Sequence, residues 1–95
     1  MPDTGRAALL ADFIGTTDWA GAERTVLAGD ASNRRYDRLR RGGESAVLMD
    51  APPEKGEDVR PFLSVAAYLS GLGLSAPRVL AQDQEAGFLL IEDLG

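Results

Sequence analysis

The sequence contains no cysteine and no histidine, and aromatic residues make up only 6% of its 95 residues. Without cysteine it can form neither a disulfide framework nor a thiolate metal site. Without histidine it lacks the commonest general base and the commonest metal ligand. The longest apolar run, residues 88–91, is far too short to cross a bilayer, and residues 1–4 lack the basic region and apolar stretch of a secretory signal. These absences predict a cytoplasmic protein with no membrane partner.

The composition is typical of one small globular domain, with 44% hydrophobic and 26% charged residues. The formal net charge of −5 at pH 7 argues against nucleic acid as a partner. The charge is uneven, because five arginines lie between residues 34 and 41 and the chain beyond them is mainly acidic. A short basic patch in an acidic domain favours a small phosphorylated ligand, although a solvated surface hairpin would also place arginines there.

Turn residues and hydrophobic periodicity predict an α+β fold. A first helix is expected over residues 4–14, with Thr4 as its N-cap and Gly15 ending it. Glu57 and Asp58 suit the N-terminus of a second, longer helix. Strands are expected over residues 24–28, 35–40, 45–49, 78–81 and 88–91, which gives a five-stranded antiparallel sheet with one long packing helix and the additional N-terminal helix.

Side-chain spacing predicts which faces are buried. In the second strand, Tyr36 and Arg38 share one face and Leu39 lies on the other. The long helix carries an apolar stripe at helical spacing, which indicates the side that packs on the sheet. The stripe consists of Val59, Phe62, Leu63, Ala66 and Leu69, with Val65 and Leu72 widening it.

The most distinctive segment is the turn Gly29-Asp30-Ala31-Ser32-Asn33, which Tyr36 follows closely. Small residues in a hairpin let main-chain N–H groups approach phosphate oxygens without a side chain in between. Ser32 and Asn33 could add side-chain donors at the tip. The same sequence also suits an ordinary hairpin, because Gly29 and Asp30 tolerate turn geometry.

The order of these elements and motifs resembles the N-terminal lobe of the aminoglycoside phosphotransferase family, a branch of the protein-kinase-like fold. The resemblance covers about residues 24–95 and is strongest to the bacterial subgroup that phosphorylates N-acetylmuramate and N-acetylglucosamine in peptidoglycan recycling. No single motif is specific, but their order and spacing together are. The matching segments are Gly29-Asp30-Ala31-Ser32-Asn33, Tyr36, Val47-Leu48-Met49, Ala76-Pro77-Arg78-Val79-Leu80 and Leu90-Ile91-Glu92-Asp93-Leu94.

The resemblance implies that residues 24–95 form an ATP-binding lobe that ends at the interlobe hinge, and that residues 1–23 form a helical extension. The hinge would bind adenine through the carbonyl of Glu92 and the N–H of Leu94, with Ile91 as the gatekeeper before them. The full set of cofactor-binding residues implied by the family is Gly29, Asp30, Ala31, Ser32, Asn33, Arg35, Arg38, Ala46, Ile91, Glu92 and Leu94, with no catalytic or metal-binding residue among them.

The third strand departs from the family pattern. Kinase-like enzymes usually hold the α- and β-phosphates with a Lys or Arg on this strand, paired with a Glu from the helix. Here the basic position is Met49 and the acidic position falls near Phe62. Losing both partners together avoids an unpaired buried charge. The resemblance then leaves Arg35 or Arg38 to neutralise the phosphates, because a guanidinium can bind two oxygens at once.

The resemblance implies a nucleotide and a small hydroxylated acceptor as partners. In the family the catalytic base and the Mg²⁺ ligands lie in a C-terminal lobe, which would follow Gly95, so the 95-residue chain alone is expected to be inactive. The hinge strand and the underside of the sheet, which would rest on that lobe, would then expose an apolar patch. Two alternatives stay open: the lobe of an aminoglycoside- or choline-type hydroxyl kinase, and a degenerate kinase-like domain that serves as a stand-alone interaction module.

Overall fold

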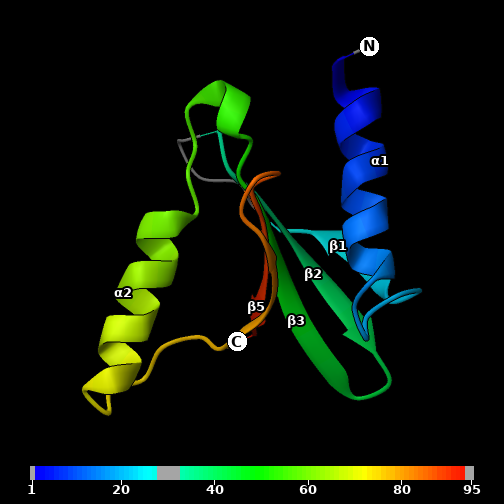
Figure 1. Ribbon diagram of the computed structural model, residues 1–95. Coiled ribbons are helices and arrows are strands. Elements are labelled where there is room, and N and C mark those ends of the chain that lie inside the picture. Colours follow the sequence, from blue (N-terminus) through cyan, green and yellow to red (C-terminus); the bar gives the residue numbers. More distant parts are fainter. Residues whose placement is uncertain (1, 28–32, 94–95) are drawn as a thin grey trace.

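The computed structural model describes residues 2–27 and 33–93, which form a five-stranded antiparallel sheet with one α-helix on each side (Figure 1). The strands lie in the order β1-β2-β3-β5-β4, so every neighbouring pair is antiparallel. The α+β prediction is therefore confirmed. The elements are α1 (Pro2–Gly15), β1 (Glu23–Val26), β2 (Arg35–Arg41), β3 (Glu44–Asp50), the 3₁₀ turn η1 (Pro53–Lys55), α2 (Arg60–Gly71), β4 (Val79–Asp83) and β5 (Phe88–Glu92).

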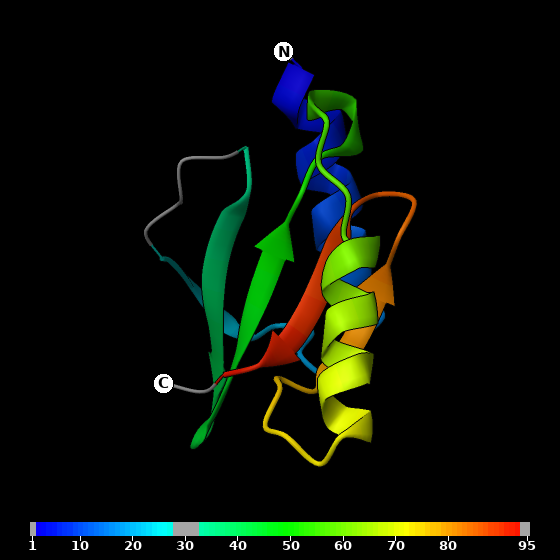
Figure 2. The ribbon, with the colours of Figure 1, turned by 90° about the vertical axis from the view of Figure 1, so that its left-hand side faces the viewer.

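The two helices cover opposite faces of the sheet, as the two ribbon views show (Figures 1 and 2). On the α1 face, Phe13 packs on Phe88 with their ring centroids 5.5 Å apart. The first 23 residues therefore contribute directly to the core. The buried cluster on this face consists of Leu10, Phe13, Trp19, Leu39, Ala46, Leu48, Phe88 and Leu90.

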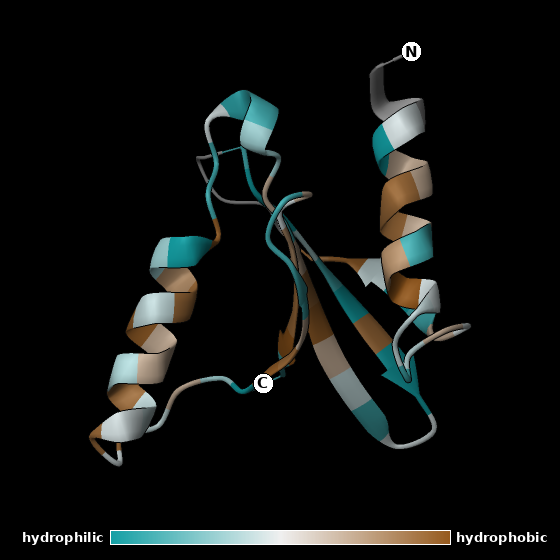
Figure 3. Ribbon diagram, in the orientation of Figure 1, coloured by the Kyte–Doolittle hydropathy of each residue, from teal (hydrophilic) through white to brown (hydrophobic). Residues whose placement is uncertain are grey.

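A second buried cluster lies on the α2 face, where alternate residues of β3 and β5 point away from α1. Hydrophobic residues are concentrated in these two central strands (Figure 3). Tyr36 packs against this cluster whereas Leu39 belongs to the first one, which confirms the predicted alternation along β2. The cluster consists of Met49, Ala51, Val59, Leu89 and Ile91, with Tyr36, Val47, Phe62, Leu63 and Val79 packed against it.

Helix α2 buries a narrower stripe than its sequence suggests. Phe62 and Leu63 pack on the second cluster and Ala66 is buried. Val65 and Leu72 are each 57% exposed, so the expected widening of the stripe is wrong. The hinge strand does not contribute to the expected apolar patch, because residues 88–91 of β5 are all at most 8% exposed. Both faces of that central strand are covered within this chain, and the exposed apolar residues lie elsewhere.

The start of helix α1 differs from the prediction. Helix α1 begins at Pro2, so Thr4 lies inside the helix and is not its N-cap. A proline fits the first turn because its missing N–H would have no partner there. Helix α2 begins at Arg60, whose main-chain N–H donates a hydrogen bond to the Asp58 carboxylate at 2.9 Å, so Asp58 lies at the helix N-terminus as predicted. Among the described residues, neither helix is long and apolar enough to span a membrane.

Candidate functional site

On the α2 face of the sheet, the end of β5 lies beside β3, and β2 lies on the far side of β3. Ile91 is paired in register with Val47, and Val47 is paired with Arg38. Cross-strand partners in a sheet share a face, so these three side chains lie in one row. Ile91 is 8% exposed and Val47 is half-buried. Val47 and Ile91 thus form the apolar part of this row, and the guanidinium of Arg38 lies at its β2 end. The Ile91 end of the row lies directly beside the main chain that leaves β5.

Asp93 follows β5 immediately and is bound from two other strands. Its Oδ2 accepts hydrogen bonds from Nε of Arg38 and from the hydroxyl of Ser45, each at 2.8 Å. Only 7% of the Asp93 side chain is exposed. Arg38 therefore lies on the face where the sequence analysis expected it, but it binds a carboxylate of the hinge segment.

On the opposite side, Glu92 is bonded to Arg78, the residue just before β4. The main-chain N–H of Glu92 donates to the carbonyl of Arg78 at 2.8 Å, and the carboxylate of Glu92 accepts from the N–H of Arg78 at 3.3 Å. Glu92 and Asp93 are thus each held by a different neighbouring segment. This is the chain position at which the family resemblance places adenine contacts.

Arg35, the other candidate for phosphate binding, lies on the α1 face. It borders a cavity of about 130 Å³ between α1 and the sheet, together with Arg6 and Asp50. Asp37 also lines this cavity, and its Oδ1 is buried without a hydrogen-bond partner among the described residues. Arg35 and Arg38 are separated by the sheet, because an odd number of residues along a strand reverses the face. They do not form one basic site.

Ala46 is likewise on the α1 face, where it is fully buried in the first cluster. It therefore cannot contact the same ring as Ile91, which belongs to the second cluster. Val47, the next residue, occupies the place beside Ile91. The alternation of side chains along β3 already indicates that Val47, and not Ala46, lies on this face. Val47 is two residues from Met49 and so shares its face, and Met49 is the position aligned with the phosphate-binding lysine or arginine of the family.

Met49 is 2% exposed and lies in the second cluster, against which Phe62 of α2 packs. Both positions that the sequence analysis aligned with an ion pair thus contribute to the same apolar core. Burying a single charge there would carry a large desolvation penalty. The apolar replacement is consistent with this packing.

The hairpin residues 29–32 and Leu94 lie outside the described residues, so their predicted roles stay predictions. Asn33 is described, and its side-chain amide donates to the carbonyl of Lys55 at 3.1 Å. Glu57 accepts the main-chain N–H of Asn33 at 3.3 Å and Nε of Arg34 at 2.8 Å. The hydrogen bond that Arg34 donates to the Glu57 carboxylate is the main cause that raises the pKa of Arg34. These bonds join residues 24 and 23 positions apart, so the local pattern that favours Glu57 as a helix-start residue does not indicate them.

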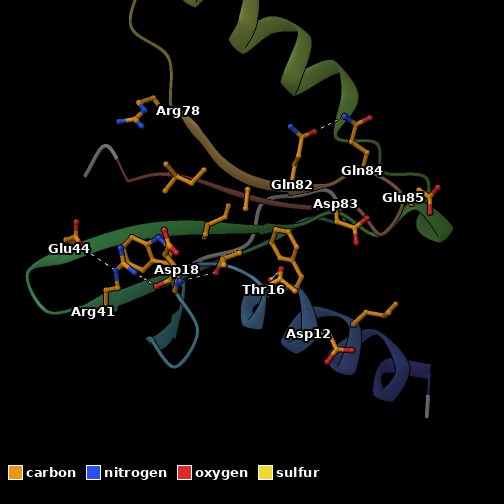
Figure 4. Close-up of a pocket in the computed structure, with 17 residues that line it drawn as sticks. Asp12, Thr16, Asp18, Arg41, Glu44, Arg78, Gln82, Asp83, Gln84 and Glu85 are labelled. Carbon is orange, nitrogen blue, oxygen red and sulfur yellow. Dashed lines mark hydrogen bonds and ion pairs between the residues drawn. The ribbon is translucent and has the colours of Figure 1, made fainter.

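A broad depression of about 1010 Å³ lies on the α1 face, between α1 and β4 (Figure 4). Arg41 stacks over Trp19 at 4.3 Å from the ring centroid and binds Glu44 at 3.1 Å as well as the carbonyl of Asp18. The depression is on the other side of the sheet from Ile91, so it is separate from the row of Arg38, Val47 and Ile91.

Within residues 2–27 and 33–93, no three acidic side chains are grouped to hold a metal ion.

Comparison with known proteins gives a consistent family. Residues 23–95 match the family described as the phosphotransferase enzyme family. The chain is 55% identical to the N-acetylmuramate/N-acetylglucosamine kinase of Pseudomonas aeruginosa, an alignment that covers 78% of the chain and 22% of that kinase. It is 35% identical to the kinase of the same name from Caulobacter vibrioides, over 95% of the chain and 32% of the relative. The chain is also 46% identical to the Pseudomonas putida kinase of that name, over 75% of the chain and 21% of that kinase. The chain thus spans less than a third of the length of these curated relatives.

Proposed function

The chain belongs to the phosphotransferase enzyme family, and from this premise we propose that it is the ATP-binding lobe of a cytoplasmic amino-sugar kinase. The acceptor class comes from the names of its relatives, which are N-acetylmuramate/N-acetylglucosamine kinases. The proposal places the protein in peptidoglycan recycling. The structural observation that carries it is the apolar surface of Val47 and Ile91 beside the main chain of Glu92.

This surface suits one face of an adenine ring. Val47 and Ile91 would contact the ring, while the carbonyl of Glu92 and the N–H of Leu94 would bind its polar edge. Binding sites for flat aromatic ligands combine apolar walls with a few fixed main-chain groups in this way. Val47 replaces Ala46 in this assignment, because the α1 face is closed by the first cluster.

The phosphates would lie toward the hairpin between β1 and β2. We assign them to the main-chain N–H groups of residues 29–32, since the amide of Asn33 is bonded to Lys55. Bound ATP would supply the phosphoryl group, and Mg²⁺ would neutralise its charge. Because the chain aligns with only 22% and 32% of the length of the Pseudomonas aeruginosa and Caulobacter vibrioides kinases, we assign the Mg²⁺ ligands and the catalytic base to a C-terminal lobe and expect the 95-residue chain alone to be inactive.

Titration of the isotope-labelled chain with ATP, followed by amide NMR shifts, tests nucleotide binding directly. The largest shift changes are expected at Val47, Ile91 and Glu92. The indole of Trp19 serves as an internal control, because it lies in the cluster on the other face. Saturating ATP that moves no amide, or that moves only residues around Trp19, would overturn the proposal.

A chimera tests the kinase assignment. The chain would replace the aligned N-terminal segment of the Pseudomonas aeruginosa kinase, which covers 22% of that protein. We expect the chimera to phosphorylate N-acetylglucosamine with ATP, whereas the 95-residue chain alone does not. A folded chimera that binds ATP without transferring phosphate would reject the sugar-kinase assignment and leave the nucleotide site standing.

A further inference from the structure

The hydrogen bonds around Asp93 connect three strands at a single carboxylate oxygen. Arg38 reaches it from β2 and Ser45 reaches it from β3, although these residues are 55 and 48 positions away in the sequence. In Figure 2 the chain that leaves β5 turns toward these two strands. We call the three residues Arg38, Ser45 and Asp93 the hinge brace.

The hinge brace spans more than one strand spacing. Arg38 is paired with Val47 on β3, and Val47 is paired with Ile91 on β5, so Arg38 and the end of β5 flank β3. Neighbouring strands are about 4.8 Å apart. The Arg38 side chain must therefore extend across β3 to place Nε 2.8 Å from Asp93. Its side chain is 24% exposed and that of Asp93 is 7% exposed, so the pair is largely shielded from solvent.

The brace works together with the contact on the other side of β5. The N–H of Glu92 is bound to the carbonyl of Arg78, while Asp93 is bound to Arg38 and Ser45. Two consecutive residues are thus held from opposite directions. This fixes the main-chain direction at the point where the chain leaves the sheet.

We propose that Asp93 is a positioning residue of the adenine site, and that Arg38 and Ser45 serve the hinge by holding it. This inference rests on the proposed nucleotide-binding function. It also assigns Arg38 to holding Asp93, whereas its charge and the family resemblance suggested phosphate binding. A guanidinium that spans β3 to neutralise a shielded carboxylate cannot keep this bond and neutralise phosphates with the same Nε–H.

The two roles of Arg38 are separated by comparing ATP with adenosine, which has no phosphate. Affinities of the chain and its variants for both ligands would be measured by calorimetry at a temperature where all are folded. If Arg38 positions the hinge, Arg38→Met lowers the affinity for adenosine and the affinity for ATP by the same factor, about tenfold. Asp93→Asn should have the same effect. The variant that carries both changes should bind adenosine no more weakly than either single variant, because both changes remove the same bond.

Arg40→Met is the matched control, since it removes the same charge two residues along β2 from an exposed side chain. It should leave adenosine affinity unchanged. Ser45→Ala removes one donor to Asp93 and provides a milder variant if Arg38→Met does not fold; a smaller loss of affinity for both ligands is expected. Loss of ATP affinity alone in Arg38→Met would identify Arg38 as a phosphate ligand and overturn the inference. Wild-type adenosine affinity in the brace variants would also overturn it, whereas a parent chain that binds neither ligand would overturn the proposed function itself.

Discussion

Gly87 lies against the main chain of Ala51, whose N–H donates to the Gly87 carbonyl at 2.8 Å. Gly87 adopts a φ of +82°, and a Cβ at this position would overlap the carbonyl oxygen of Ala51. This contact joins the turn between β4 and β5 to the segment that follows β3. Both the backbone conformation and the close approach require glycine.

Replacing this glycine should therefore be costly. Gly87→Ala is expected to lower the free energy of unfolding by about 3 kcal/mol, because it combines a strained φ with a main-chain overlap. Urea denaturation measures the change. Gly42 has a φ of +54°, but a Cβ there would meet open space, so Gly42→Ala should lower the free energy of unfolding by only about 1 kcal/mol. Gly43 has neither constraint, and a Gly43→Ala variant as unstable as Gly87→Ala would contradict this explanation.

The sequence was sufficient to predict the antiparallel sheet, because turn residues and alternation along β2 are local properties. It placed α1 but not its first residue, because Thr4 has the side chain of a good N-cap while the helix begins two residues earlier, at Pro2. The extent of the buried stripe on α2 also depended on tertiary contact. Val65 fits the helical period but points away from the sheet, and only the orientation of the docked helix decides this.

The family resemblance assigns the candidate site a position along the chain, whereas the faces on which its side chains lie had to come from the structure. Ala46 and Arg35 lie on the α1 face, away from Ile91. Register across three strands decides such faces, and one residue of shift reverses them. The bond between Arg38 and Asp93 joins residues 55 positions apart, so no local pattern could have indicated it.

Arg6 fastens α1 to the sheet. Its guanidinium lies 4.6 Å from the centroid of Phe88, and Nε is 2.8 Å from Oδ1 of Asp50. Arg6→Met should lower the free energy of unfolding by about 2 kcal/mol, because a shielded carboxylate loses its partner and the cation–π contact is lost. Thermal and urea unfolding measure this. The ion pair between Arg60 and Asp58 is solvent-exposed, so Arg60→Met is the control, and an equal loss in both variants would refute the role of Arg6.

Asp58 provides a prediction for pH dependence. Hydrogen bonds from the side chain and then the main chain of Arg60 lower the pKa of Asp58 from 3.8 to about 2. Because the folded-state pKa is depressed, the associated stability is present above pH 3.8 and is lost as the pH falls toward 2. The effect should be small and sensitive to salt, since the pair is exposed. Carboxyl NMR titration measures the pKa. Arg60→Met should raise it toward 3.8, and an unchanged value in the variant would contradict the assigned cause.

The apolar replacement at Met49 can be tested by reversing it. Met49 is 2% exposed and Phe62 packs against the same cluster. Met49→Lys alone should lower the free energy of unfolding by about 3 kcal/mol, because it buries a charge without a partner. Met49→Leu, which nearly conserves volume, should cost less than about 1.5 kcal/mol.

Adding Phe62→Glu to Met49→Lys distinguishes an ion-pair position from an ordinary core position. If the two residues face each other as the family pattern implies, the double variant should be more stable than the sum of the single changes predicts, by about 1 kcal/mol or more. Urea unfolding of the parent, both single variants and the double variant completes the cycle. Strict additivity would show that Met49 and Phe62 share a cluster without occupying the two ends of a former ion pair. In that case the aligned positions, rather than the fold, would need revision.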